Sequence, residues 1–227
     1  MKIFIAGQGP LGEQAIRLTQ AAGYAVVADA ASADYILPVA YDETLPTDKL
    51  LADMDAWALT NSRLASDAFL QARGFPVPAY FPGGSEPYIV KPDKGGGGRG
   101  IWVTEDFCEV GGAVNAGFVA QEELPGDVWS AVVTGRPGAY TAHPPVRLIF
   151  RERKRTGAEL APAPEGDALR QLATDIAQTL ELRGILEVEA IWSRNAWWVT
   201  DLNARLPLFT PDTLETNLLT ELVRAFS

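Results

Sequence analysis

The sequence predicts an α/β protein whose C-terminal part has the α+β character of an antiparallel sheet with packed helices. Three observations support this. The chain opens with an apolar run, a glycine turn and a helical pattern, in the order of a βαβ unit. A glycine run joins two expected strands in the middle, and an acidic hairpin is expected near the C-terminus. The 227 residues suffice for one large domain or for two to three small ones.

The N-terminal segment predicts a small parallel layer. Its expected elements are a strand at residues 2–6, a helix at 13–22, and strands at 24–28 and 35–39. Gly7, Gly9 and Gly12 also fit the G-x-G-x-x-G pattern of dinucleotide-binding folds, with Asp29 near the expected ribose position. Sixty residues do not supply two mononucleotide halves, and Pro10 occupies the turn, so a structural turn is favoured over NAD binding.

A helix and a linker follow this layer. Asn61 and Ser62 predict the start of a helix over residues 63–72, and the proline- and glycine-rich stretch 81–87 predicts a linker. We therefore expect a first domain at 1–74, a small subdomain at 75–126 and a large subdomain at 127–227. The further expected strands cover 88–91, 101–104, 118–124, 129–134 and 146–153, and the further expected helices cover 167–182 and 214–226.

Charge and residue counts exclude several classes of function. A formal net charge of −10 argues against a nucleic acid or an anionic membrane as partner. No segment reaches the roughly 18 apolar residues of a membrane span. Cys108 is the single cysteine, which favours a reducing, cytoplasmic location. His143 is the single histidine, expected in a loop beside two prolines, so a Cys/His zinc site is excluded.

The acidic hairpin is the first feature that indicates chemistry. Alternate side chains of a strand share a face, so Glu187 and Glu189 point one way, as do Asp201, Asn203 and Arg205. A tight turn at residues 193–195 makes the two segments antiparallel. Carboxylate and amide oxygens beside a cation suit Mg²⁺ bound to a polyphosphate, whereas a solvated charged face is the alternative.

The glycine run is the second feature. Gly95, Gly96, Gly97 and Gly98 lie between Lys91 and Arg99 in a predicted hairpin. Without side chains, successive backbone N–H groups can converge on a phosphate, and Lys91 adds a full positive charge. Because two residues would suffice for a turn, phosphate binding is favoured over a mobile hairpin tip.

The order of these motifs resembles the ATP-grasp superfamily of carboxylate-amine ligases. The motifs are the strand lysine and glycine hairpin, then residues 121–126, 184–189 and 201–205. The C-terminal part is most similar to the pyrrolysine-biosynthesis branch, whose ligases join 3-methyl-ornithine to lysine. The resemblance implies an ATP-grasp fold with a shortened N-terminal layer.

The resemblance also implies roles for individual residues. Lys91 and Arg63 would contact ATP phosphates, and residues 95–100, with Arg99, would form a lid. Adenine would meet backbone groups of Glu122 and Leu124 within a segment that also contains Gln121 and Glu123, and Asp127 lies near the ribose position. Mg²⁺ would bind Glu189, Asp201 and Asn203, and Arg205 would meet the phosphoryl group or a substrate carboxylate. One residue among Arg151, Arg153, Lys154 and Arg155 could face the γ-phosphate.

The implied activity is an ATP-dependent ligase that forms an amide through an acyl-phosphate, with amino acids or their derivatives as substrates. A second subunit could complete the shortened substrate layer, as in a homodimer. Val128 stands where a ribose-binding acid is usual, and Asp201 replaces a more common Glu. These departures favour the alternative, a catalytically reduced nucleotide-binding or partner-binding module.

Overall fold

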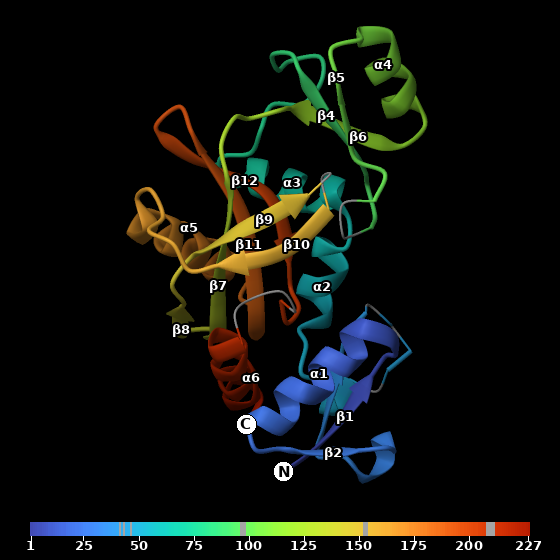
Figure 1. Cartoon of the computed structure of the whole chain (residues 1–227), viewed down its shortest axis with the longest axis vertical. Coiled ribbons are helices and arrows are strands. Elements are labelled where there is room, and N and C mark those ends of the chain that lie inside the picture. Colours follow the sequence, from blue (N-terminus) through green and yellow to red (C-terminus); the bar gives the residue numbers. More distant parts are fainter. Residues whose placement is uncertain (41, 43, 46, 96–98, 152–153, 208–211) are drawn as a thin grey trace.

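The computed structural model describes all residues except 41, 43, 46, 96–98, 152–153 and 208–211, and no side chains at 10, 47 and 212–217. Its described strands form three sheets. Figure 1 shows them along the long axis, with β4–β6 and α4 at the top, β7–β12 and α5 in the middle, and β1, β2 and α1 at the bottom. The predicted mixture of parallel and antiparallel layers is therefore confirmed.

The N-terminal layer is a parallel sheet, as predicted, and its strand order is β2-β1-β3. Its elements are β1 (Lys2–Ala6), α1 (Gly9–Ala21), β2 (Ala25–Val27) and β3 (Tyr35–Pro38), with 3-10 turns at Ala30–Ser32 and Thr47–Lys49. Helix α1 begins four residues before the predicted start at residue 13, because Pro10 suits the first helical turn.

The glycines before α1 have a packing role. A Cβ atom on Gly12 would lie 2.8 Å from the Gly7 carbonyl oxygen, and one on Gly7 would collide with Val39. Gly7 also has φ +144°, a conformation that side chains disfavour. The close approach of α1 to Gly7 thus requires a glycine at position 12, and the packing of Val39 requires one at position 7.

Two helices connect this layer to the rest of the molecule. Helix α3 (Arg63–Ala72) has the predicted bounds, and the Ser62 hydroxyl accepts a hydrogen bond from the Ala65 N–H at 3.2 Å. Helix α2 (Met54–Thr60) was not predicted, although Asp53 caps it through the Ala56 N–H at 3.0 Å.

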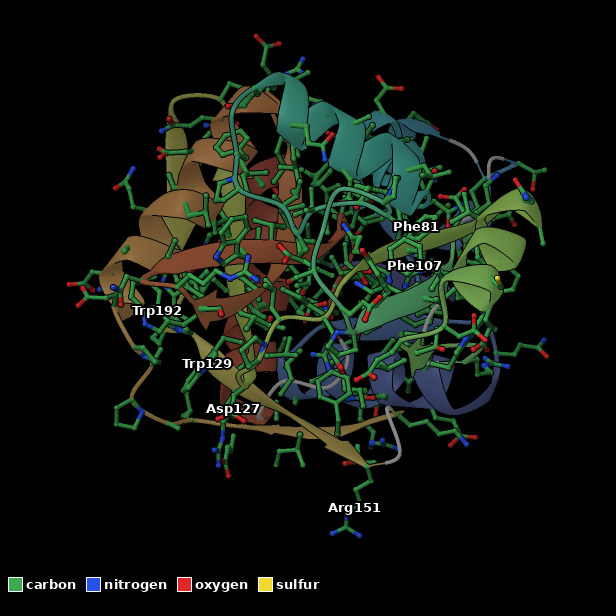
Figure 2. All side chains as sticks on the ribbon, turned by 90° about the horizontal axis from the view of Figure 1, so that it is seen from above. Phe81, Phe107, Asp127, Trp129, Arg151 and Trp192 are labelled. Carbon is green, nitrogen blue, oxygen red and sulfur yellow. The ribbon has the colours of Figure 1, made fainter. Side chains whose placement is uncertain are left out.

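The small sheet has the order β5-β4-β6 and contains the predicted glycine hairpin. Its strands are β4 (Tyr88–Pro92), β5 (Trp102–Thr104) and β6 (Phe118–Glu122). Helix α4 (Phe107–Asn115), which was not predicted, covers one face through Val110. Figure 2 shows Phe81 and Phe107 side by side, and their ring centroids are 4.9 Å apart.

The large sheet has the order β10-β9-β7-β11-β12, with β8 on β7. Its strands are β7 (Val128–Arg136), β8 (Ala139–Ala142), β9 (Val146–Arg151), β10 (Lys154–Glu159), β11 (Gly184–Ser193) and β12 (Ala196–Asn203). The helices are α5 (Gly166–Thr179) and α6 (Asp212–Phe226). The predicted strand over 146–153 is described only to Arg151, and β8 and β10 were not predicted.

Strand alternation gives the large sheet two buried faces. Ala131 and Val133 pack with α5, α2 and α3, whereas Val132 between them packs with α6 and the N-terminal layer. Helix α6 therefore joins the N-terminal layer to the large sheet. Leu70 of α3 belongs to the core of the large sheet. The domain boundary at residue 74 stays a prediction.

His143 lies between β8 and β9, as predicted for a loop histidine, but it is only 7% exposed. Its Nε2 atom lies 3.0 Å from the Thr134 hydroxyl and 3.2 Å from a carboxylate oxygen of Glu221 on α6. Burial lowers its pKa below the ordinary value, although Glu221 acts in the opposite direction. Among the described helices, none has the length and apolar character needed to cross a membrane.

Candidate active site

The predicted acidic hairpin is formed by β11 and β12. In the register of the two strands, Glu189 lies opposite Asp201 and Glu187 opposite Asn203. A two-residue turn with φ of +53° and +58° at Arg194 and Asn195 joins the strands, as expected for a tight hairpin. The register shifts directly after Glu189. The hairpin therefore gathers the oxygen atoms that the sequence analysis selected.

Arg155 of β10 holds the two glutamates. One of its nitrogens donates to Glu187 at 2.8 Å and the other donates to Glu189 at 3.1 Å. The Ser130 hydroxyl also donates to Glu187 at 2.9 Å. Arg155 therefore faces the carboxylates of the hairpin. Which residue of the basic run faces the γ-phosphate stays a prediction.

The carboxylates influence one another because they are buried. Burial, followed by the charges of Glu187 and Asp201, raises the pKa of Glu189 to about 8. Burial also opposes ionisation of Glu187, but the Arg155 guanidinium holds the pKa of Glu187 below its ordinary value. The second oxygen of Glu187 is buried with no hydrogen-bond partner in the described structure. A further cation near this cluster would relieve the repulsion.

Lys91 extends from β4 toward the same hairpin. It is 7% exposed, and its ammonium donates to the Gln121 side-chain oxygen at 3.3 Å and to the Thr200 carbonyl at 3.4 Å. Thr200 is the additional residue of the β12 bulge, which directs that carbonyl toward Lys91. Burial lowers the pKa of Lys91, whereas Asp201 acts to raise it.

Arg63, the first residue of α3, connects the glycine hairpin to Asp201. Its guanidinium donates to the carbonyls of Pro92 at 2.6 Å and Gly95 at 3.3 Å, and it lies 3.7 Å from an Asp201 oxygen. Asp93 accepts from the Leu64 N–H at 2.9 Å and from the Ser62 hydroxyl at 2.8 Å. These contacts attach the N-terminus of α3 to the end of β4.

A first cavity of about 300 Å³ lies between the small and large sheets. Its walls are mainly apolar, and Lys91, Arg63, Glu189 and Asp201 form its charged end. The other lining residues are Pro78, Ile89, Ile101, Glu122, Glu123, Leu124, Gly126, Val128, Phe150, Ile191 and Thr200. Apolar walls suit a flat aromatic base, and an end that carries two cations and two acids suits phosphates bound together with a metal ion.

A second cavity of about 250 Å³ shares Arg63 and Asp201 with the first. It is lined mainly by polar groups, including Asn203 and Arg205, and an Arg205 nitrogen donates to the Asn203 side-chain oxygen at 3.3 Å. The remaining lining residues are Ala40, Trp57, Thr60, Asn61, Asp93 and Gly95. Of the residues proposed for metal and phosphoryl chemistry, Asp201 borders both cavities, Lys91 and Glu189 line the first, and Asn203 and Arg205 line the second.

Some residues selected from the sequence lie elsewhere. Gln121 is buried behind Lys91, and the Glu122 side chain pairs with Arg194 at 2.8 Å, although Glu122 also lines the first cavity. Asp127 does not line either described cavity and accepts from Arg147 at 3.2 Å. Figure 2 labels its side chain beside Trp129.

Most described basic residues of the lid and of the β9–β10 hairpin point to solvent and not to the cavities. Arg99 and Lys154 are exposed, and Figure 2 shows the Arg151 side chain pointing away from the molecule. Gly96, Gly97, Gly98 and Arg153 lie outside the described residues.

Sequence reasoning missed Trp57, Thr60 and Asn61 in the second cavity, because helix α2 was not predicted. The Asp53 cap before an apolar Ala-Trp-Ala-Leu run was the available signal. It also missed Asp67, an acid three residues before Leu70 on the buried face of α3. That spacing, which places an acid beside core residues, could have identified it.

A model of the ATP-grasp domain matches residues 60–207. The chain belongs to the ATP-grasp family. The match includes α3 with Arg63, the small sheet, and the hairpin of β11 and β12. It therefore covers the charged end of the first cavity, and the predicted family and fold are confirmed.

Curated relatives include 3-methyl-D-ornithine–L-lysine ligases. The protein of Methanosarcina acetivorans is 29% identical over 181 residues, which cover 78% of this chain and 49% of the relative. The Methanosarcina barkeri protein is 28% identical over 182 residues, with coverage of 78% and 49%. This chain spans about half the length of these relatives.

Solved structures share the ATP-grasp fold at low sequence identity. D-alanine–D-alanine ligase from Bacillus anthracis, complexed with ATP, has a TM-score of 0.72 and 12% identity, covering all of this chain and 97% of that one. Phosphoribosylamine–glycine ligase from Thermotoga maritima has a TM-score of 0.77 and 15% identity, with coverage of 100% and 75%. These similarities establish the fold alone.

Proposed function

We propose that the protein is an ATP-dependent ligase that joins a carboxylate to an amine, with amino acids or their derivatives as substrates. The observation that carries the proposal is that two cavities of different chemistry meet at Arg63 and Asp201. One suits a nucleotide and the other a small polar substrate, and a phosphoryl group can pass between them only where they join. The curated relatives, named as ligases of two amino acids, support the substrate class.

ATP would lie in the first cavity, with its base between the apolar walls. Lys91 and Arg63 stand at the charged end, where they can neutralise phosphate oxygens. The backbone carbonyl of Glu122 and the backbone amide of Leu124 would meet the adenine edge, so the side chains there can vary. Asp127 is proposed near the ribose only on the family pattern, because its carboxylate pairs with Arg147.

Mg²⁺ would bind to Glu189, Asp201 and Asn203. No group of three or more His, Cys, Asp or Glu side chains among the described residues is arranged to hold a metal. Two carboxylates and an amide oxygen nevertheless fit Mg²⁺, which takes few protein ligands and completes its octahedron with phosphate and water. Burial, followed by the charges of Glu187 and Asp201, raises the pKa of Glu189, so a bound cation would favour the ionised form of this carboxylate. Bound Mg²⁺ supplies charge neutralisation for the transferring phosphoryl group.

The second cavity would hold the carboxylate substrate, oriented by Arg205 and Asn203. A carboxylate oxygen attacks the γ-phosphorus, the bond to the β–γ bridging oxygen breaks, and ADP leaves with that oxygen. The amine then attacks the acyl carbon of the acyl-phosphate, phosphate departs with the C–O electron pair, and the amine nitrogen loses a proton. No side-chain nucleophile is required, since the protein positions the reactants and stabilises charge.

The test is a screen for ADP release with Mg-ATP and pairs of amino acids. We expect at least one pair to stimulate ADP release and Lys91→Ala to abolish that release while preserving the circular dichroism spectrum. Near-normal ADP release by Lys91→Ala would refute the assigned role of Lys91.

A nucleotide-binding module without turnover is the second candidate. Val128 stands in the lining of the first cavity where the family pattern has a ribose-binding acid, and this departure favours the second candidate. It predicts that Mg-ATP binds to the protein in calorimetry while no amino acid stimulates ADP release. The same screen therefore separates the two functions.

A further inference from the structure

Asp67 is a buried acid that the proposed mechanism does not use. It lies on the core-facing side of α3 and is 4% exposed. One of its oxygens accepts from the Tyr80 hydroxyl at 2.6 Å and from the Gln121 side-chain nitrogen at 2.9 Å. Gln121 is itself only 1% exposed, and its side-chain oxygen accepts from the Lys91 ammonium at 3.3 Å. Asp67 is thus two hydrogen bonds away from Lys91.

The direction of these hydrogen bonds follows from their chemistry. An ionised carboxylate only accepts hydrogen bonds, so Gln121 must turn its NH₂ group toward Asp67. The carbonyl oxygen of Gln121 then faces Lys91, whose ammonium only donates. A neutral amide in place of Asp67 could accept or donate, so the orientation of Gln121 would then be held from the Lys91 side only.

Lys91 benefits from a fixed acceptor because its stem is flexible. Its ammonium has three donors, of which two are directed to Gln121 and to the Thr200 carbonyl. Lys91 also lines the first cavity, so a donor remains for a ligand there. Two fixed oxygens behind the ammonium therefore determine where that donor points.

We propose that Asp67 is a positioning residue that acts through Gln121 to hold the Lys91 ammonium at the charged end of the first cavity. The inference rests on the proposed function, in which Lys91 contacts ATP phosphates. Asp67 touches neither cavity, so its effect on ATP is transmitted by the relay of Asp67, Gln121 and Lys91.

The energetic cost of this arrangement agrees with a functional role. Burial raises the pKa of Asp67 to about 6, although Tyr80 and Lys91 act to lower it. A side chain of similar shape without charge would avoid this cost of desolvation. Buried acids with a perturbed pKa occur often at functional sites.

The first experiment measures Mg-ATP affinity by calorimetry. We expect Asp67→Asn to weaken binding roughly tenfold, as for loss of a charge-assisted hydrogen bond. Gln121→Leu removes the middle of the relay and should weaken binding to a similar extent. Ser66→Ala is the matched control, because it removes a buried polar group from the same helix outside the relay. Unchanged affinity in Asp67→Asn and Gln121→Leu would overturn the proposal.

The second experiment tests the coupling between Asp67 and Lys91 without nucleotide. Thermal unfolding is measured for the wild type, Asp67→Asn, Lys91→Met and the double variant. We expect Asp67→Asn to change Tm by an amount that is on the order of 3 °C more negative in the wild-type background than in the Lys91→Met background. Equal changes in the two backgrounds would overturn the relay. If the wild type binds no Mg-ATP, the proposed function fails, and this cycle still decides whether Asp67 acts on Lys91.

Discussion

The two cavities that share Arg63 and Asp201 differ in the chemistry of their lining residues and in the elements that supply them. Apolar side chains from paired strands form most of the first cavity, for example Ile89 of β4 and Ile191 of β11. Polar groups from α2 and from the ends of elements form the second, including Asn61 and Asp93. A paired strand holds its side chains in place through its register, so the first cavity offers a fixed wall that suits one constant ligand, ATP. The ends of elements that line the second cavity vary more readily, so we expect substrate identity to depend on the second cavity.

The largest expected effect comes from Asp201, one of the two side chains that both cavities share. Asp201→Asn should reduce amino-acid-stimulated ADP release by roughly a thousandfold, as when one stabilising group is removed from a transition state. The fold should be preserved, because the lost attraction of Asp201 to Arg63 and Lys91 is offset by relief of its repulsion with Glu189. The measurement combines steady-state ADP release with thermal unfolding. Asp175→Asn on α5, outside both cavities, is the control, and comparable activity in the two variants would separate Asp201 from the chemistry.

Filling the apolar cavity should affect ATP and spare the second cavity. Ile191→Trp adds bulk between the walls and should weaken Mg-ATP binding roughly a hundredfold, which corresponds to the upper range for overpacking. Calorimetry measures this. Ile149→Trp adds the same bulk at an exposed position outside both cavities, so it should bind Mg-ATP normally. Normal binding by Ile191→Trp would place the nucleotide elsewhere.

The sequence predicted the first cavity better than the second, for a physical reason. Strand alternation selected Glu189 and Asp201, which both line the first cavity, and the register places them opposite each other. The cap at Ser62 likewise predicted the start of α3. Local periodicity is sufficient where chemistry lies on regular elements.

The second cavity and the relay depend on packing between distant segments. Asn61 and Arg205 are brought together only after α2 packs against the large sheet, and α2 is too short for a clear periodic signal. Asp67 and Gln121 are 54 positions apart. Nothing in the local pattern of either segment specifies their contact. Arg155 could not be distinguished from its neighbours for the same reason, since its partners lie on another strand.

The second cavity should respond to a smaller change. Asn61→Ala removes one polar group from its lining and should raise the KM for the carboxylate substrate roughly fivefold, as for one hydrogen bond. The KM for Mg-ATP should stay unchanged, because Asn61 does not line the first cavity. Steady-state kinetics with each substrate varied in turn distinguishes the two constants. Asn115→Ala on α4 is the control, and an increase confined to the KM for Mg-ATP would reverse the assignment of the cavities.

The smallest expected effect is a gain in Mg-ATP affinity from a substitution in the first cavity. Val128 lines it at the first residue of β7, where the family pattern places a ribose-binding acid, whereas the Asp127 carboxylate is held by Arg147. Val128→Glu offers the ribose hydroxyls an acceptor and should tighten Mg-ATP binding by about threefold, a fraction of one hydrogen bond after desolvation. Calorimetry with Mg-ATP and with Mg²⁺-bound inorganic triphosphate, which has no ribose, measures the gain. A threefold gain for ATP alone would place the ribose beside Val128, and an equal gain for both ligands would contradict that placement.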